Sequence, residues 1–302
     1  MTRAFFLYLS QRPGLRRFLE SNPTARGMTR RFIAGETLED ELRVCAELAA
    51  EGIWTTADHL GENVTSLADG VAARDAYMAT LDAIAARGLP STISLKLTAL
   101  GLDLSEAAAV EHLRRLATRA KEIGSRVEID MEDTRYTERT IRIAEMVGRE
   151  TGCIRVAIQA YLYRTPGDID RLNRARVMVR LCKGAYIEPA SAAMPKKSDV
   201  DAAYLSLAKT LLDEGTYPAL ATHDEKTIEA ILIHVRMREY DSKRFEFEML
   251  HGVRRDLQRD LVNRGFHSRV YVPYGSEWYR YFMRRLAERP ANVWFLIKNL
   301  FR

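Results

Sequence analysis

From Gly52 onward, short apolar runs alternate with longer segments of helical periodicity, and this alternation constrains the fold more than any other feature. Each run is rich in β-branched or aliphatic residues, and Gly, Pro or Asn separates many of the segments. The runs predict strands at Ile53–Asp58, Thr92–Leu97, Arg126–Met131, Ile154–Tyr161, Arg176–Cys182, Tyr217–Thr222, Arg244–Met249 and Arg269–Val272.

The segments between these runs have the apolar spacing of amphipathic helices. They are Ala72–Ala86, Ser105–Ile123, Thr137–Arg149, Asp201–Glu214, Lys226–Arg238 and Arg254–Arg264. Strands that alternate with helices form βαβ units of a parallel sheet, and eight such units close a barrel. We therefore predict an α/β fold, a (β/α)8 TIM-like barrel over residues 51–302, with a C-terminal substrate-binding helix.

Two connections fit this scheme less well. The stretch 164–175 is short for a full helix, although Thr165-Pro166-Gly167-Asp168 has the composition of a turn that opens one. Residues 187–199 form a long loop after the fifth strand, where barrel enzymes place lids and binding elements. Before the barrel, residues 1–50 have helical spacing interrupted at Ser21-Asn22-Pro23-Thr24, which predicts an N-terminal helical cap.

Composition narrows the function classes. The net charge of +5 is spread along the chain, which is compatible with anionic ligands or a membrane surface but does not indicate nucleic-acid binding. Cys45, Cys153 and Cys182 are too scattered for disulfides or zinc, and no cluster has metal-ligand spacing, so we expect a reducing cytoplasm and no metal. No run reaches the ~20 apolar residues of a membrane-spanning helix, so any membrane contact would be peripheral.

Ionisable or polar residues stand near the ends of almost all the predicted strands. They are Lys96, Asp130, Gln159, Arg180, Thr222, His223, Glu246, Glu248 and Tyr271. In a parallel barrel the active site lies at the carboxyl ends of the strands, so this distribution indicates an enzyme. Each residue also has a structural explanation: Lys96 could extend to solvent, Asp130 could cap a helix, and Glu246 could face outward. Likewise, Gln159 could bridge strands and His223 could be a core histidine.

A buried charge needs a partner, because leaving it unpaired costs several kcal/mol. We therefore expect Lys96, Asp130 and Arg180 to surround a shared ligand together with an arginine pair near the C-terminus. That pair lies in Tyr281–Glu288, where helical spacing places Tyr281, Arg284, Arg285 and Glu288 on one face. Two guanidiniums side by side can hold a carboxylate or phosphate; the alternative is a solvated basic face.

The fifth strand is followed by Lys183-Gly184-Ala185, where a glycine lets backbone N–H groups approach a phosphate-bearing cofactor. Neither the Gly-x-Gly-x-x-Gly of a dinucleotide fold nor a Gly-Lys-Ser/Thr loop is present. The residue pattern alone therefore predicts a barrel enzyme with an anionic substrate and a phosphorylated cofactor.

Several segments resemble the proline dehydrogenase family, in the order in which that family carries them. The segment 179–186, Val-Arg-Leu-Cys-Lys-Gly-Ala-Tyr, is similar to its Arg-Leu-x-Lys-Gly-Ala-Tyr motif, and 281–292 is similar to its Tyr-x-x-Arg-Arg-Leu-x-Glu-x-x-Ala-Asn motif. Further matches are Leu60-Gly61-Glu62, Ile93-Ser94-Leu95-Lys96-Leu97, Ile129-Asp130, Gln159-Ala160-Tyr161, Ala221-Thr222-His223 and Phe245-Glu246-Phe247.

The resemblance implies a monofunctional bacterial enzyme with a (β/α)8 barrel and bound FAD. Such an enzyme oxidises L-proline to Δ1-pyrroline-5-carboxylate, the first step of proline degradation to glutamate, and passes electrons to membrane quinone. It would lie in the cytoplasm or peripherally on the inner face of the cell membrane. The sequence indicates no oligomeric state.

The resemblance also assigns roles to residues. Asp130 and Arg180 would form the catalytic pair, Arg284 and Arg285 would hold the proline carboxylate with Lys96 beside it, and Glu62 would pair with Arg284 as a gate. The proline ring would be walled by Tyr186, Leu250, Tyr271 and Tyr281. Flavin contacts would come from Met131, Ala157, Gln159, Arg180, Lys183, Gly184, Ala185, Thr222 and His223.

Three positions depart from the family pattern. Glu248 stands where Gln is usual, Arg280 where Pro is frequent, and Ile187 where other branches carry Trp. Glu248, at a strand end, would alter the redox potential or the pH dependence. Two other functions stay open at this point. One is a Schiff-base lyase with Lys96 as nucleophile, and the other is a non-catalytic barrel that binds anions or a membrane surface.

Overall fold

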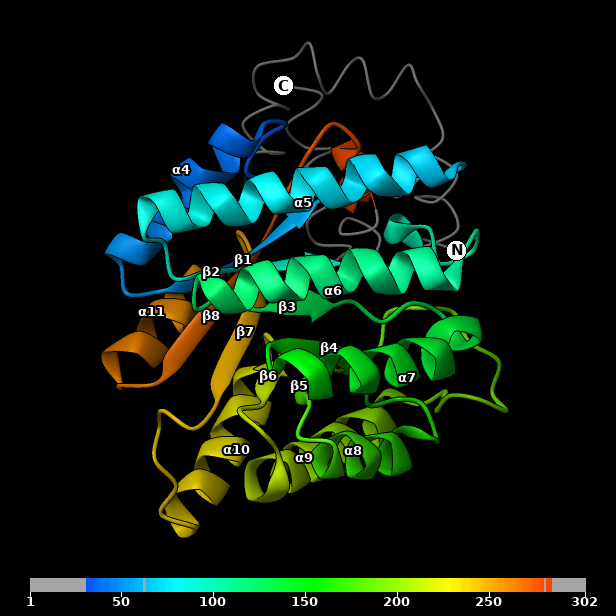
Figure 1. The fold of residues 1–302 in the computed structure, drawn as a ribbon. Coiled ribbons are helices and arrows are strands. Elements are labelled where there is room, and N and C mark those ends of the chain that lie inside the picture. The colour runs from blue at the N-terminus through cyan, green and yellow to red at the C-terminus, as the bar shows by residue number, and fades with distance from the viewer. Residues whose placement is uncertain (1–30, 62–63, 280, 284–302) are drawn as a thin grey trace, which may run out of the picture.

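The computed structural model describes residues 31–61, 64–279 and 281–283 of the 302-residue chain. Parallel strands β1 to β8 form a closed barrel in sequence order, and helices surround it (Figure 1). The strands are β1 Trp54–His59, β2 Ser91–Leu95, β3 Val127–Ile129, β4 Ile154–Gln159, β5 Met178–Cys182, β6 Ala219–Ala221, β7 Glu246–Leu250 and β8 His267–Tyr274. The predicted (β/α)8 fold is confirmed, and every predicted strand lies within two residues of its observed bounds at either end.

The helices follow the strands as predicted. They are α5 Leu67–Arg87, α6 Glu106–Glu122, α7 Thr134–Thr151, α8 Thr165–Arg174, α9 Lys197–Glu214, α10 Glu225–Met237 and α11 Arg255–Asn263, with a short 3-10 helix η1 at Thr98–Leu100. Helix α8 forms in the connection that looked short, with Pro166 in its first turn. Helix α5 begins five residues before its predicted start, because Ser66 and Asp69 form a capping box ahead of Gly70.

Helix α4, Leu38–Ala50, precedes the barrel and packs on the outer face of β1 and β8. Its residues Val44 and Leu48 lie in one apolar cluster with Val270 and Val272 of β8. The predicted N-terminal helical cap, residues 1–50, is described only from residue 31, so its domain boundary stays a prediction. Helix α4 covers the place where the barrel closes.

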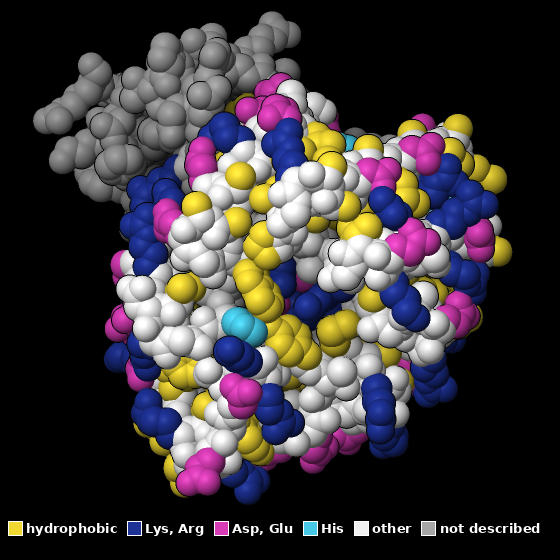
Figure 2. Space-filling model, turned by 60° about the vertical axis from the view of Figure 1, so that its left-hand side comes forward, with side chains coloured by type: hydrophobic (Ala, Val, Ile, Leu, Met, Phe, Trp, Pro, Cys, Tyr) yellow, Lys and Arg dark blue, Asp and Glu magenta, His cyan; other side chains and the backbone are white. Residues whose placement is uncertain are grey.

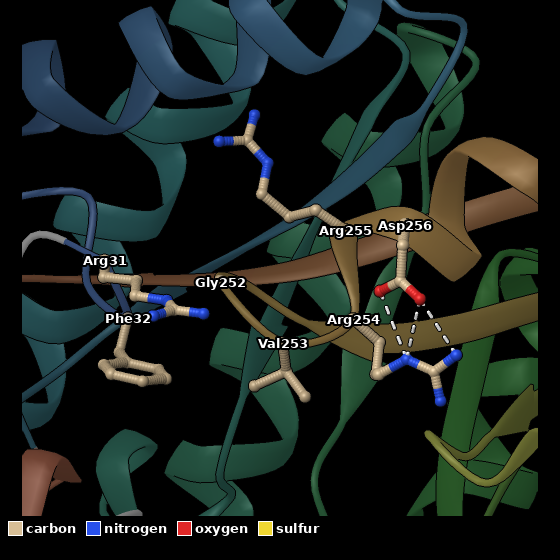
Figure 3. Close-up of a pocket in the computed structure, with 7 residues that line it drawn as sticks. All are labelled: Arg31, Phe32, Gly252, Val253, Arg254, Arg255 and Asp256. Carbon is tan, nitrogen blue, oxygen red and sulfur yellow. Dashed lines mark hydrogen bonds and ion pairs between the residues drawn. The ribbon is translucent and has the colours of Figure 1, made fainter. Parts of the chain in front are cut away.

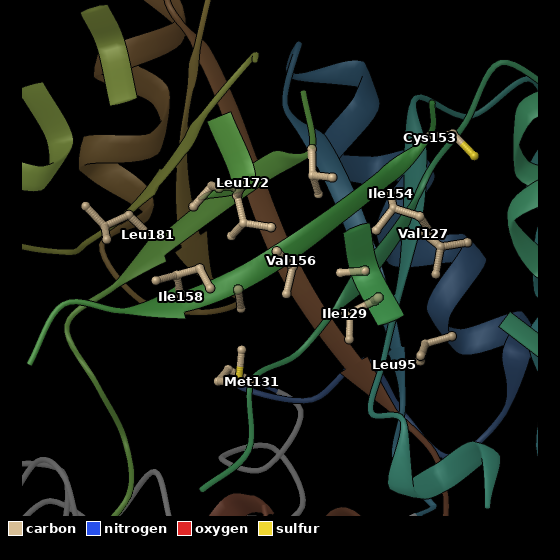
Figure 4. Close-up of a cluster of buried hydrophobic side chains, with 14 of the residues drawn as sticks. Leu95, Val127, Ile129, Met131, Cys153, Ile154, Val156, Ile158, Leu172 and Leu181 are labelled. Atoms are coloured by element: carbon tan, nitrogen blue, oxygen red, sulfur yellow. The ribbon is translucent and has the colours of Figure 1, made fainter. Parts of the chain in front are cut away.

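The apolar core lies between the strands and the helices. Leu95, Ile129, Val156 and Leu181 project from successive strands into this layer, which Figure 4 shows with Leu172 of α8. Their burial between sheet and helices is the main source of hydrophobic stabilisation in a barrel of this kind. Since the apolar side chains of each strand point outward to the helices, the residues that alternate with them must point into the barrel.

Candidate active site

The inside of the barrel is filled by charged side chains. Glu128 in β3, Arg155 in β4, Glu246 in β7 and Arg269 in β8 are each at most 2% exposed. Their neighbours along the strands face the helices and, except for Ser268 beside Arg269, are apolar, so the period of two directs the charges inward. The alternative in which Glu246 faces outward is wrong, because this side chain is 0% exposed.

The lower part of this interior is an ion cluster near the amino ends of the strands. Arg155 forms an ion pair with Glu246 and a second one, at 3.2 Å, with Glu128. Arg269 Nε lies 2.6 Å from Glu246 Oε1, and its Nη1 donates to the Thr55 carbonyl oxygen at 2.5 Å. Each buried charge therefore has an opposite charge and further hydrogen bonds, which offset its desolvation.

The upper part is organised around Arg180 of β5, which is 4% exposed. Its guanidinium contacts three carboxylates, Glu128 and Asp130 at 2.5 Å each and Glu248 at 2.9 Å. The Tyr271 hydroxyl donates to Asp130 Oδ2 at 2.5 Å, and the Tyr271 ring lies against the guanidinium, 5.2 Å from its central carbon. Glu128 uses one oxygen for Arg180 and the other for Arg155, so it joins the upper and lower clusters.

Two members of the predicted ring of charges, Arg180 and Asp130, neutralise each other without a ligand, while the arginine pair of that ring lies outside the described residues. Three carboxylates already surround Arg180, and Ser94 Oγ accepts a further hydrogen bond from it at 3.4 Å. A guanidinium has five N–H donors, so these contacts use four of them and leave one for a ligand. The predicted pair of Asp130 and Arg180 is brought together at the mouth of the barrel.

The three glutamates inside the barrel, Glu128, Glu246 and Glu248, differ in acidity. Burial raises the pKa of Glu128 and Glu246, but nearby arginines outweigh it, so both pKa values are lowered, that of Glu246 to about 2. Burial raises the pKa of Glu248 to about 7, since attraction to Arg180 is opposed by repulsion from Glu128 and Glu246. Glu248 Oε1 is also buried without a hydrogen-bond partner among the described residues. Glu248 is thus the carboxyl of this group that changes charge near neutral pH.

Polar groups meet at the carboxyl ends of β4 and β5. The Gln159 side chain donates to the Glu132 carbonyl oxygen at 3.1 Å and accepts from the Ala185 backbone N–H at 3.1 Å. Lys183 Nζ lies 2.6 Å from Asp201 and 3.4 Å from Asp224. The amide of Gln159 therefore fixes the backbone after β5 beside a lysine whose charge is balanced by acids.

The turn after β5 is closely packed. Gly184 has φ +131°, and a Cβ atom there would lie 2.4 Å from the ring of Tyr161, so a side chain would displace this ring or the turn. The loop is tied down further along, where Glu188 accepts hydrogen bonds from the backbone N–H and the hydroxyl of Thr134, at the start of α7.

At the carboxyl ends of β6 and β7, the imidazole of His223 joins the polar groups of the barrel mouth. His223 Nε2 accepts a hydrogen bond from the Leu250 backbone N–H at 2.9 Å, which places the proton of the neutral ring on Nδ1. The Thr222 backbone N–H donates to the Glu248 carbonyl oxygen at 3.1 Å, and the Thr222 hydroxyl accepts from the Asp224 N–H at 3.2 Å. The ends of β6 and β7 are therefore joined beside Arg180.

Other predicted site residues lie around the same mouth. Lys96 directly follows β2, Met131 follows Asp130, and Ala157 pairs in register with Arg180. Tyr281 is 7% exposed in a helical stretch that includes residues 278–279 and 281–283. Tyr186 is half-buried, and its carbonyl oxygen accepts from the Tyr161 hydroxyl. Glu62, Arg284 and Arg285 lie outside the described residues, as does Arg280, so the gate and the arginine clamp stay predictions.

A cavity of about 320 Å³ lies where residues 31–32 meet the loop between β7 and α11. Figure 3 shows Arg31, Arg254 and Arg255 around it, with Arg254 bonded to Asp256. Gly252 has φ +73°, and a Cβ atom there would lie 1.7 Å from the Arg31 carbonyl oxygen. The N-terminal segment can dock on this loop only because residue 252 is a glycine.

Sequence reasoning missed four residues of the interior, namely Ser94, Glu128, Arg155 and Arg269. Their signal was present in the sequence, because Ser94, Glu128 and Arg155 each stand between two buried apolar residues, and Arg269 stands before buried Val270. In a barrel covered by helices, a charge in such a position faces inward.

None of the helices in the part of the chain that the structure describes has both the length and the apolar character needed to cross a membrane. Within the same residues, no group of three or more His, Cys, Asp and Glu side chains is placed to hold a metal ion.

The chain was compared with known proteins. Residues 42–298 match the family model described as "Proline dehydrogenase". The chain is 41% identical to "Proline dehydrogenase 1" of Bacillus subtilis (strain 168) over 302 residues, all of both chains, and 37% identical to "Proline dehydrogenase" of Deinococcus radiodurans, covering 91% of this chain and 90% of that one.

Solved structures also match this chain, and the matched proteins include proline utilization A. Proline utilization A (PutA) from Bdellovibrio bacteriovorus, inactivated by N-propargylglycine, matches 87% of this chain with a TM-score of 0.81 and 26% identity. The chain covers about a third of that larger protein, 32% of its length.

Proposed function

Because this chain belongs to the proline dehydrogenase family, we propose that it oxidises L-proline to Δ1-pyrroline-5-carboxylate, the first step of proline degradation to glutamate. The observation that carries this proposal is the match to monofunctional proline dehydrogenases along the whole chain. The arrangement of Arg180, Asp130 and Tyr271 at the barrel mouth supports it.

The cofactor in this proposal is FAD, which supplies the acceptor for the hydride that leaves C5 of proline. The groups at the ends of β4 to β6 suit it in chemistry, since an amide, an ammonium, a hydroxyl and an imidazole can pair with flavin and pyrophosphate atoms. We assign this contact to Gln159, Lys183, Gly184, Ala185, Thr222 and His223, with Met131, Ala157 and Arg180. Lys183 is the one that already pairs with carboxylates, at Asp201 and Asp224.

The chain's own residues supply orientation and charge. Arg180 is fixed by Glu128, Asp130 and Glu248, so its positive charge needs no rearrangement when negative charge develops beside it. Asp130 is held from its other side by Tyr271, which keeps both groups in one geometry.

Substrate would be held by residues that the resemblance assigns. Arg284 and Arg285 bind the proline carboxylate, with Lys96 beside it. Tyr186, Leu250, Tyr271 and Tyr281 exclude water from the ring, and Glu62 closes on Arg284. In this proposal, a bound substrate would lie between the arginine pair and the cofactor.

An anaerobic absorption spectrum tests the cofactor, the substrate and the reaction together. The purified protein is expected to be yellow and to bleach on addition of L-proline, because reduced flavin loses its visible absorption. A colourless protein that takes up no added FAD would rule the proposal out.

The clamp can be tested separately. Arg285→Met is expected to raise the KM for proline by roughly tenfold to a hundredfold, the worth of a charge-assisted hydrogen bond. The matched control is Arg236→Met, which alters an exposed arginine on α10. Equal KM values for the two variants would remove the clamp from the mechanism.

The electron acceptor in this proposal is a membrane quinone, reached by peripheral contact with the inner face of the cell membrane. The test is proline-dependent reduction of a soluble quinone, together with sedimentation of the protein with anionic vesicles. Lack of quinone reduction by an enzyme that proline bleaches would argue against this acceptor.

A further inference from the structure

A second cavity, of about 520 Å³, lies at the opposite end of the barrel from the candidate active site. It opens between the carboxyl ends of α5 and α6 and the amino ends of β1, β2 and β3, with Trp54, Ile84, Ile123 and Arg126 in its wall. Figure 2 turns the left-hand side of Figure 1 toward the reader and shows a hollow with basic side chains inside and apolar ones around it. The size suits a small organic ligand.

Arg126 is the unusual residue of this cavity. Its guanidinium lies 5.0 Å from the centre of the Tyr217 ring, but its Nη1 is buried with no hydrogen-bond partner among the described residues. No ion pair of Arg126 is found in that part of the chain either. Leaving a buried N–H group without an acceptor costs on the order of 1–3 kcal/mol, and more when the group is charged. A ligand that supplied an acceptor to Arg126 would remove this cost.

Nearby charges do not supply that acceptor. Burial, together with repulsion from Arg155 and Arg269, lowers the pKa of Arg126 to about 10, while Glu246 and Glu128 partly oppose this shift. The guanidinium is therefore still charged at neutral pH. Arg269 also lines the cavity, but four of its five N–H donors are taken by Glu246, Thr55 and Thr92.

The surroundings select one class of anion. The cavity has a single unpaired guanidinium, and the carboxyl ends of α5 and α6, at Gly88 and Ile123, carry partial negative charge that opposes a dianion. The walls next to Arg126 are apolar, from Trp54, Ile84 and Ile123. A planar carboxylate fits a guanidinium edge in two parallel hydrogen bonds, and its apolar body would lie against these walls.

We propose that this cavity binds a monocarboxylate with a compact apolar body, which pairs with Arg126 and lies apart from the proline site.

Calorimetric titration of the purified holoenzyme with benzoate, and separately with inorganic phosphate, tests this. Arg126→Met removes the cation and keeps its alkyl length. Ala85→Glu adds a carboxylate at an exposed helical position on the cavity rim, where folding is not at risk. Arg174→Met, at an exposed position in the last turn of α8, is the matched control.

The wild type and Arg174→Met are each expected to bind benzoate at the Arg126 site, one site per chain. In Arg126→Met the affinity for benzoate at this site is expected to fall by roughly tenfold or more, so that one site per chain is lost from the titration. Ala85→Glu is expected to lose the same site. Any benzoate that binds at the proline site is expected to do so equally in all four proteins, because neither substituted cavity residue lies near the proline site. Equal stoichiometry in all four would overturn the proposal, as would phosphate binding as tightly as benzoate at the Arg126 site.

Discussion

Glu248 is one of the three positions at which the resemblance predicts a departure from the family pattern, and its carboxyl has an unusual pKa in the structure. Its carboxyl shares Arg180 with Glu128 and Asp130, which places three acids around one base. Burial raises its pKa from 4.5 to about 7. Since the folded state holds this proton more tightly than the unfolded chain, Glu248 favours folding below pH 4.5, and this advantage declines as the pH rises to about 7.

Glu248→Gln should remove this pH dependence. We expect the free energy of unfolding of the wild type to fall relative to that of the variant by on the order of 3 kcal/mol between pH 4.5 and 7.5. Urea unfolding across this range measures it. Glu47→Gln, an exposed carboxyl paired with Arg43, serves as the control and should follow the wild type. Parallel curves for the wild type and Glu248→Gln would mean that Glu248 is already ionised at low pH.

At the residue scale, the sequence predicted the positions better than the partners. Asp130 and Gln159 were expected at strand ends and lie there, whereas Arg180 is the middle residue of β5. The hydrogen bond between Tyr271 and Asp130 was not expected. Tyr271 lies in β8 and Asp130 directly follows β3, and these two strands are not adjacent in the barrel. Contacts across the barrel depend on its tilt and stagger, which no local pattern encodes.

At the scale of elements, local signals placed the strands well because each is an apolar run between helices. The starts of helices were less exact, since capping by Ser66 extends α5 before its periodic part. The docking of residues 31–32 on the loop between β7 and α11 was not predicted. This docking depends on Gly252, because a side chain at residue 252 would collide with the Arg31 carbonyl oxygen, a contact that the sequence of the loop does not reveal.

Gly252→Ala should therefore destabilise far more than a substitution at a glycine with the same backbone angle. Gly152 has φ +74° and no atom within 4 Å of its missing Cβ, while Gly252 has φ +73° and the Arg31 carbonyl oxygen at 1.7 Å. We expect Gly152→Ala to cost about 1–2 kcal/mol of unfolding free energy, the price of the left-handed conformation. Gly252→Ala is expected to lose this amount and, in addition, the free energy needed to displace residues 31–32 from the loop.

The measurement is urea unfolding of both variants, with hydrogen exchange of the backbone amides near residue 31. Faster exchange there in Gly252→Ala, but not in Gly152→Ala, is the expected pattern. If the two variants lose the same stability and exchange alike, the contact with Arg31 contributes nothing.

For the whole molecule, the main finding is that a continuous ion network fills the barrel. It runs from Arg269 and Glu246 through Arg155 and Glu128 to Arg180 at the mouth. Such a network holds Arg180 rigidly, since each member is fixed by the next. Its weakness is that removing one member leaves a buried charge unpaired.

Arg155→Met is expected to lower the free energy of unfolding by about 3–5 kcal/mol. Arg43→Met, which breaks an exposed pair with Glu47 on α4, should cost less than about 1 kcal/mol. Adding Glu246→Gln to Arg155→Met should recover part of the loss, because it reduces the excess of buried negative charge, although Glu246 still pairs with Arg269 in the single variant. Additive losses in the double variant, measured by urea unfolding, would show that the two residues are not coupled.

The sequence by itself determined the order of strands and helices, the barrel and the polar residues at its mouth. These follow from periodicity and from the rule that parallel strands end at one face. Tertiary structure alone decided which charges pair, that Arg180 is neutralised without a ligand, and that Arg126 faces a cavity at the far end. The reason is that pairing and cavities arise from residues distant in the chain, whose separation is set only when the barrel closes.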